Sequence, residues 1–231
     1  MSFLDKDFSL ASGERVSNIA LDDIPPDHWA RYSYACDAIA PLAARANGTL
    51  IGADIFCGSG YGAHLIAQRV PCFLLGLDGS AESISEAASR FVVLNLLFSH
   101  KFFPFSLPAA HFDFIVSMES IEHVENGNQV FALLAQAIRP GGRLIISAPN
   151  RRVIDLANNP YQWHYKHYID EEIQALGKSC GLHMLEYFGA DCTIVNAEGK
   201  VIAGNYFSPD AGSLRAQYQG DTLTYLFERP L

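Results

Sequence analysis

The feature that most constrains the fold is a regular alternation between short apolar runs and segments whose apolar residues recur with helical periodicity. The apolar runs cover residues 50–56, 72–77, 112–118 and 144–147. Helices are predicted around them, over residues 28–46, 61–70, 80–91 and 130–137 and from Asp170 onward. Strands and helices that alternate in this way are typical of right-handed βαβ units, in which helices cover both faces of a parallel sheet.

The two ends of the chain depart from this alternation. Residues 1–26 are polar and end in Pro25-Pro26, so they are predicted to form an N-terminal arm or lid, and residues 27–231 to form a single domain. Near the other end, residues 182–188 and 222–227 are predicted strands with no convincing helix between them. Two such strands joined by a long loop are expected to pair antiparallel at the edge of the sheet.

Composition narrows the class of protein and of partner. Of the 231 residues, 49% are hydrophobic and 18% are charged, which fits one globular domain with a sizeable core. The net charge of −9 disfavours nucleic acid as a partner, and no apolar stretch is long enough for membrane insertion. The first residues lack an export signal, so a cytoplasmic location is expected. The five cysteines are scattered without a Cys-x-x-Cys pair and are expected to be free thiols. The oligomeric state stays open.

A glycine-rich motif follows the first predicted strand and precedes a predicted helix. It runs Asp54-Ile55-Phe56-Cys57-Gly58-Ser59-Gly60-Tyr61-Gly62, and Asp78 ends the next apolar run 20 residues after Gly58. Glycines let the backbone approach a ligand closely, and an acid at this spacing can accept hydrogen bonds from ribose hydroxyls. The combination predicts a nucleoside-binding site. A Walker-type phosphate loop is excluded because Gly-Lys-Ser/Thr is absent, and a nicotinamide oxidoreductase is disfavoured because no Tyr-x-x-x-Lys pair occurs.

Four motifs in order make the chain resemble class I S-adenosylmethionine-dependent methyltransferases over residues 27–188. Gly58-Ser59-Gly60 is similar to their first motif, Asp78 to their ribose-binding acid, residues 112–124 to their fourth strand and its turn, and residues 139–144 to the turn into their fifth strand. The resemblance implies a doubly wound, Rossmann-like α/β fold: a mostly parallel seven-stranded sheet with an antiparallel C-terminal edge strand. It also implies S-adenosylmethionine as cofactor, with Asp54, Ser117 and Met118 among the contacts.

A narrower likeness lies upstream. The chain is similar to bacterial methyltransferases associated with O-antigen and other glycan synthesis in three short motifs: Gly13-Glu14-Arg15, His28-x-x-Arg31-Tyr32 and Gly60-Tyr61-Gly62. This likeness implies that Arg31 and Tyr32 contact the methionyl end of the cofactor. The alternative is an ordinary helix face.

Two positions depart from the methyltransferase pattern. Phe56 occupies a place that is usually glycine, and residues 101–106, where the family has an acid that recognises adenine after its third strand, contain none. Backbone groups, together with stacking on Phe105, are the expected substitute.

The acceptor side is expected where the fourth and fifth strands end. Methyl transfer is an in-line displacement, and an alcohol acceptor needs a base to take its proton. Glu122, His123 and His164 are the predicted catalytic residues, with His167 a further candidate. Together with Glu119 the three resemble the magnesium site of small-RNA 2′-O-methyltransferases and, in part, of ubiquinone-pathway O-methyltransferases. Three interpretations stay open: a Mg²⁺ site, a metal-free base, and a structural network.

The acceptor itself is only weakly indicated. The upstream likeness favours O-methylation of a sugar or glycan intermediate. A quinone precursor, a secondary metabolite, or a catalytically silent cofactor-binding regulatory domain are the alternatives. DNA adenine methylation is disfavoured because Asn159-Pro160-Tyr161 is misplaced for the signature of those enzymes. Four aromatic residues, Tyr161, Trp163, Tyr165 and Tyr168, either line the acceptor pocket or pack a connection.

Overall fold

A computed structural model describes residues 20–46, 48–158, 163–191, 193–198, 200–204, 215–216 and 220–231. Most of the predicted arm, including Gly13-Glu14-Arg15, lies outside the described residues, as do Asn159, Pro160, Tyr161 and Cys192. The described part of the arm is a short 3-10 turn, Leu21–Asp23, that leads into helix α1, Pro26–Arg45. The other described cysteines, Cys36, Cys57, Cys72 and Cys180, are free thiols, as expected.

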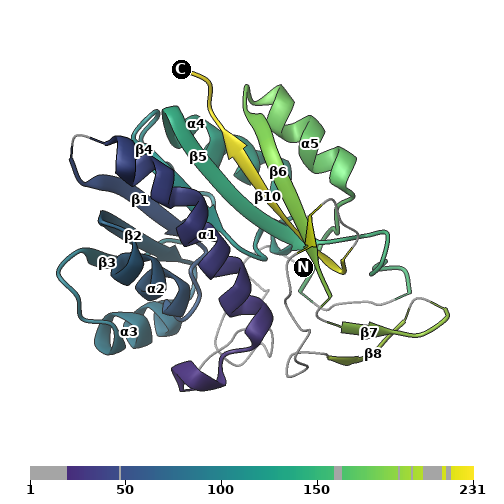
Figure 1. The fold of residues 1–231 in the computed structure, drawn as a ribbon. Helices are drawn as coiled ribbons and strands as arrows, with labels where there is room; N and C mark the ends of the chain where they lie inside the picture. The colour runs from purple at the N-terminus through teal and green to yellow at the C-terminus, as the bar shows by residue number, and fades with distance from the viewer. Residues whose placement is uncertain are drawn as a thin grey trace.

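The described strands form one eight-stranded sheet and a separate two-stranded hairpin (Figure 1). The order across the large sheet is β3-β2-β1-β4-β5-β10-β6-β9. Its first five members in chain order are β1 (Leu50–Ile55), β2 (Cys72–Asp78), β3 (Leu96–His100), β4 (Phe112–Ser117) and β5 (Ile138–Pro149), all parallel. The later members are β6 (His183–Ala190), β9 (Arg215–Ala216) and β10 (Thr222–Glu228), and the hairpin pairs β7 (Thr193–Val195) with β8 (Val201–Gly204).

The antiparallel C-terminal strand lies two places in from the edge at which the sequence suggests it. Strand β10 is antiparallel to both of its neighbours, β5 and β6, so β6 runs parallel to β5. The margin of the sheet is β9, a two-residue strand antiparallel to β6. The fold class is therefore confirmed, with β10 in an interior position. Buried apolar side chains on β10, such as Tyr225 and Phe227, suit that position.

Helices cover both faces of the sheet, as the doubly wound fold requires. Helices α1, α2 (Tyr61–Arg69) and α3 (Ala81–Arg90) pack on one face, through a core that includes Ile39, Ile66 and Ala87. Helices α4 (Gly127–Ala137) and α5 (Asp170–Ser179) pack on the other face, through Phe131 and Ile173. None of the described helices has the length and apolar character of a membrane span.

The arrangement of β1, β2 and β4 positions the site. The three strands are parallel, so their carboxyl ends and the turns that follow meet at one edge of the sheet. The connection from β3 to β4 contains no helix, and its Phe103, Phe105 and Leu107 pack against the core beside this edge. Ligands of open α/β sheets bind outside the carboxyl ends of the strands.

Candidate functional site

The glycine-rich turn joins β1 to α2 and contains two left-handed glycines. Gly58 has φ 54° and Gly60 has φ 81°, a region that side-chain-bearing residues rarely adopt. A Cβ on Gly60 would also lie 2.7 Å from Ala87 and Phe98, whereas a Cβ on Gly58 would meet nothing within 4 Å. Both packing and backbone conformation thus require glycine at position 60. At position 58 only the backbone conformation requires it, and the space around that residue is open.

Asp78 is held against this turn by main-chain hydrogen bonds. Its Oδ2 accepts from the N–H of Gly58 at 2.9 Å, and its Oδ1 accepts from the N–H of Ser80 at 2.8 Å. The carboxylate is 2% exposed. The structure therefore brings together the glycine motif and the acid that the sequence paired with it.

Phe56 shows why glycine is usual at its position. It has φ 63°, a left-handed conformation that costs free energy for a bulky side chain. Its N–H donates to the carbonyl of Leu77 at 2.6 Å, and its ring lies 5.9 Å from that of Phe105. Phe105 in turn packs edge-on to Phe103, at 5.7 Å between ring centroids. An aromatic cluster thus borders the turn where the sequence lacks an acid for adenine.

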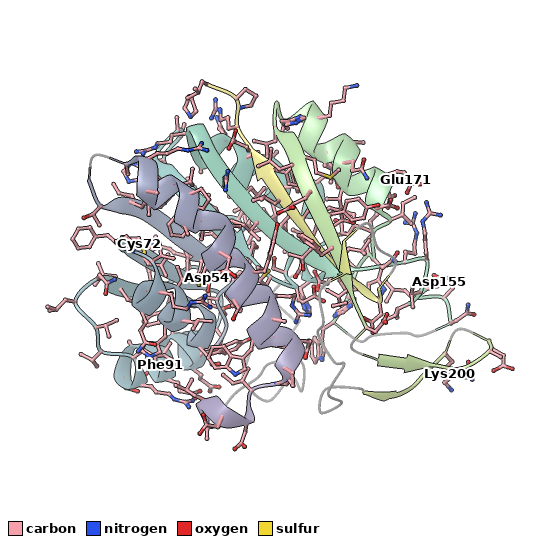
Figure 2. All side chains as sticks on the ribbon, in the orientation of Figure 1. Asp54, Cys72, Phe91, Asp155, Glu171 and Lys200 are labelled. Carbon is pink, nitrogen blue, oxygen red and sulfur yellow. The ribbon has the colours of Figure 1, made fainter. Side chains whose placement is uncertain are left out.

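Asp54 lies at the end of β1, close to helix α1 in Figure 2, and is fully buried. The Tyr32 hydroxyl donates to both of its oxygens, at 3.3 and 3.2 Å. Burial raises the pKa of Asp54 to about 8, against the opposing effect of the Tyr32 hydrogen bond. Gly62 makes room for this pair, since a Cβ there would lie 2.0 Å from the Tyr32 ring.

A buried charge pair lies on the same helix. Arg31 Nη1 is 3.0 Å from Asp27 Oδ2, and the two residues are 2% and 1% exposed. The neighbouring His28 Nδ1 lies 2.6 Å from the Tyr61 hydroxyl, and burial, with Arg31 nearby, lowers the pKa of His28 to about 4. Sequence reasoning selected Arg31 and missed Asp27, although their i,i+4 spacing is the usual signal for a helical ion pair.

The turn after β4 carries Ser117, Met118 and Glu119. Ser117 Oγ donates to the carbonyl of Ile55 at 3.0 Å, which ties β4 to the end of β1. Met118 is buried in the core on the α1 side. These two predicted cofactor contacts therefore sit beside the glycine-rich turn.

Glu119 is directed toward β5 and β10. It has φ 45°, and its Oε1 accepts from the Ser147 hydroxyl at 2.7 Å while its Oε2 accepts from the Thr222 hydroxyl at 3.4 Å. Burial raises the pKa of this carboxyl, and the positive charge of Arg31 opposes that shift. Glu119 thus connects the turn after β4 electrostatically to helix α1.

Glu122, His123 and His164 come together as a cluster. One ligand atom from each lies within 4.8 Å of the others, and Glu122 is fully buried. The His123 Nε2 is 3.9 Å from the Glu122 Oε1, and the two histidine rings are 4.6 Å apart at their centroids. The Tyr165 N–H donates to the Glu122 carbonyl at 2.7 Å, which fixes the two segments together. Of the four expected ligands, Glu119 is not in this cluster.

A third histidine lies behind the cluster. His167 is 1% exposed, its Nε2 lies 2.6 Å from His164 Nδ1, and its Nδ1 lies 2.5 Å from the Ile154 carbonyl. Burial lowers the pKa of His167. His123 Nδ1 makes a similar contact, at 3.2 Å, to the carbonyl of Trp163. Of the aromatic residues in this segment, Tyr168 belongs to the core, while Trp163 and Tyr165 are half-buried.

Known proteins share this sequence pattern. Residues 27–197 match the sequence profile of a methyltransferase-domain family. A probable S-adenosylmethionine-dependent methyltransferase from Mycolicibacterium smegmatis is 28% identical over 137 residues, which cover 58% of this chain and 52% of that protein. A ubiquinone biosynthesis O-methyltransferase from Rhodopseudomonas palustris is 30% identical over 103 residues, 42% of this chain and 39% of that protein. The chain thus spans about half the length of the curated relatives it matches.

Solved structures agree on the fold. An S-adenosylmethionine-dependent methyltransferase from Mesorhizobium loti superposes with a TM-score of 0.65 at 16% identity, over 88% of this chain and all of that one (100%). The cyclase SpnF superposes with a TM-score of 0.60 at 14% identity, over 86% of this chain and 81% of that one. At such identities the likeness concerns the fold alone. The family follows from the match of residues 27–197 to the methyltransferase-domain profile. The chain belongs to the class I S-adenosylmethionine-dependent methyltransferases.

Proposed function

We propose that this chain transfers a methyl group from S-adenosylmethionine to a hydroxyl oxygen of a small acceptor, with a sugar or glycan intermediate as the favoured class. The observation that carries the proposal is a cluster of three side chains, in which Glu122 and His123 follow β4 and His164 comes from the connection between β5 and α5. Its turn lies beside the glycine-rich turn of β1, because Ser117 bonds to Ile55. A proton-accepting cluster next to a cofactor turn suits an acceptor that must lose a proton.

The cofactor half of the reaction falls to the residues around β1 and β2. The open surface at Gly58, with Ser59 and Gly60 in the same turn, accepts the nucleoside, and Asp78 binds its ribose hydroxyls. Arg31, Tyr32 and Asp54 form the end that receives the methionyl group. The carboxylate of Asp54 favours a positively charged cofactor. Ser117 and Met118 close the site on the β4 side.

The transfer itself breaks one bond and forms one. The acceptor oxygen attacks the methyl carbon, a C–O bond forms, and the C–S bond breaks with its electron pair left on sulfur. The hydroxyl proton passes to the cluster of Glu122, His123 and His164. General base catalysis of this kind contributes roughly 10²–10⁴-fold in rate. A neutral amine needs no such base before attack, which is why a hydroxyl acceptor fits these side chains better.

Support for the acceptor class comes from three directions. One relative named above is a ubiquinone biosynthesis O-methyltransferase, which establishes oxygen methylation only for that protein. The upstream motif with Arg31 and Tyr32 is similar to glycan-associated methyltransferases. The net charge of −9 disfavours nucleic acid. A phenolic quinone precursor is the second candidate, because the half-buried Trp163 and Tyr165 could border an aromatic ring as well as a sugar.

The test begins with cofactor binding and proceeds to acceptors. Isothermal titration with S-adenosylhomocysteine should show micromolar binding, with NAD⁺ as a control that shows none. Radiolabelled methyl transfer is then measured on panels of sugar, phenol and amine acceptors of matched size. Methylation of a hydroxyl acceptor is the expected result. Transfer confined to amines would contradict the proposal, and binding without any transfer would favour a regulatory domain.

A further inference from the structure

We infer that Glu122, His123 and His164 bind a divalent first-row transition-metal ion, and that His167 positions His164 for this task. The inference deepens the proposed function, since it rests on the same acceptor-side cluster. It departs from the Mg²⁺ site that the sequence suggests. The hydrogen bonds behind the two imidazoles carry it.

The hydrogen bonds of His167 fix the tautomer of His164. The Ile154 carbonyl can only accept, so His167 Nδ1 carries a hydrogen and donates to it at 2.5 Å. His167 is 1% exposed, and a neutral ring is favoured there because burying a charge is costly. Its Nε2 then accepts, and His164 Nδ1 is the donor of the 2.6 Å hydrogen bond between them. A neutral His164 therefore presents a lone pair at Nε2.

The tautomer of His123 is fixed in the same way, by a hydrogen bond to a different carbonyl. The Trp163 carbonyl can only accept, so His123 Nδ1 carries the hydrogen of the 3.2 Å contact. The lone pair of His123 then lies on Nε2, the atom that is 3.9 Å from the Glu122 Oε1. An imidazole that donates its other N–H to a carbonyl or to a further fixed group is the usual arrangement behind a metal-binding histidine.

The geometry suits one ion with three protein ligands. The three ligand atoms lie within 4.8 Å of one another. Bonds of about 2.0–2.2 Å to nitrogen and oxygen place ligand atoms roughly 3–4 Å apart, so a contraction of at most about 1–2 Å closes the site. The His123 side chain is 21% exposed, which leaves a side from which an acceptor hydroxyl could reach the ion.

The donor set disfavours Mg²⁺. Mg²⁺ prefers oxygen ligands, and imidazole suits Zn²⁺, iron, copper and nickel. Glu119, which would supply a second carboxylate, accepts hydrogen bonds from Ser147 and Thr222 instead. Two nitrogens and one oxygen remain, and these residues do not fit the magnesium site that the sequence resembles. When bound, a transition-metal ion would lower the pKa of an acceptor hydroxyl. The ion would then take over from the ligating side chains the task of promoting proton loss, and the proton would leave to water.

The experiment measures cation binding without cofactor or acceptor. The full chain is stripped with a chelator and titrated with Co²⁺, followed by visible absorption and by isothermal titration. One Co²⁺ per chain is expected, displaced by stoichiometric Zn²⁺ and retained in 100-fold excess of Mg²⁺. Absence of Co²⁺ binding by the folded protein, or equal displacement by Mg²⁺, would overturn the inference.

Variants assign the ligands and the positioning residue. His164→Asn should weaken Co²⁺ binding by more than about 100-fold, and His167→Ala by about 10–100-fold. His167→Gln should recover most of the affinity, because its amide oxygen can accept from His164 Nδ1. His183→Ala, at an exposed histidine on β6, is the matched control and should change nothing. Circular dichroism checks folding, and if His167→Ala does not fold, the glutamine and His164 variants decide. Unchanged Co²⁺ binding in His164→Asn would contradict the ligand set.

Failure of this inference and failure of the proposed function give different results. Hydroxyl methylation that persists in chelator, with no Co²⁺ binding, would remove the ion and keep the function. Co²⁺ binding that depends on His164, without transfer to any hydroxyl, would keep the ion and remove the function.

Discussion

The cofactor side and the acceptor side of this site are built in opposite ways. Around β1 and β2, Gly58 and Ser80 hold Asp78 through main-chain N–H groups, within a stretch that is nearly continuous in sequence. On the acceptor side, His123 and His164 come from separate segments, and their reactive groups meet through side-chain contact, although one main-chain hydrogen bond, from Tyr165 to Glu122, also joins the segments. Main-chain geometry tolerates many side chains, whereas a side-chain cluster changes with each substitution. From this contrast we expect related methyltransferases to share the cofactor and to differ in the acceptor.

The largest effect is expected from a double histidine variant that disrupts the acceptor side and leaves the cofactor side intact. His123→Ala combined with His164→Ala should lower turnover by roughly 10²–10⁴-fold, because both imidazoles that assist deprotonation of the acceptor hydroxyl are removed. Affinity for S-adenosylhomocysteine should stay within about twofold of the wild type. Steady-state kinetics and isothermal titration on the same preparations measure both. Equal losses of turnover and of cofactor affinity would show that the two sides are not separable.

Asp78→Ala breaks the cofactor side. It removes the acceptor of two main-chain hydrogen bonds and the expected ribose contact, and hydrogen bonds to charged groups are worth about 1.5–3 kcal/mol each. Affinity for S-adenosylhomocysteine should fall about 100-fold or more in isothermal titration. Asp37→Ala, at an exposed carboxylate paired with Arg69, is the control and should bind normally. Wild-type affinity in Asp78→Ala would remove the ribose assignment.

Gly62→Ala sharpens the comparison by moving a side chain without touching Asp54. The added Cβ would overlap the Tyr32 ring at 2.0 Å and push the hydroxyl away from the Asp54 carboxyl. Overpacking of this kind costs about 1–3 kcal/mol in the free energy of unfolding. Urea unfolding measures it, with Gly48→Ala, which meets nothing within 4 Å, as the neutral control. Equal stability of the two variants would contradict the close packing of Tyr32.

The smallest expected effect is a pH dependence confined to the cofactor side. Burial raises the pKa of Asp54 to about 8, so the carboxylate forms only as pH rises toward that value. If the positively charged S-adenosylmethionine requires the carboxylate, its affinity should rise nearly tenfold between pH 6 and pH 7 and level off above about pH 8. Titrations across this range measure it, and Asp54→Asn should remove the slope. An unchanged slope in Asp54→Asn would assign the titration to another group.

Residue patterns predicted what is local, and the one non-local feature anticipated, the cluster of Glu122, His123 and His164, came from a resemblance to known sites. The strand and helix alternation and the spacing from Gly58 to Asp78 are encoded in neighbouring residues, so both were predicted, except that no predicted run covers β3. The interior place of β10 depends on pairing between strands far apart in the chain, which periodicity does not encode.

Glu119 and Glu122 illustrate the same limit at the site. They lie three residues apart in one turn, and both were candidate ligands. A left-handed backbone at Glu119 turns its side chain toward Ser147, and no pattern of residue types announces that conformation. The hydrogen bond from His167 to the Ile154 carbonyl was equally invisible, because it joins loop residues without a repeat.

The interior position of β10 also sets an order of assembly in time. A ribosome adds about 5–20 residues per second, so β5 is made several seconds before residues 222–228 exist. During that interval one edge of β5 has no partner strand, while β1 to β4 and the turn at Gly58 are already complete. A nascent chain of this protein should therefore gain its nucleoside turn first. Strand β6 pairs with β10 and not with β5, so it can join the sheet only after β10 has been made.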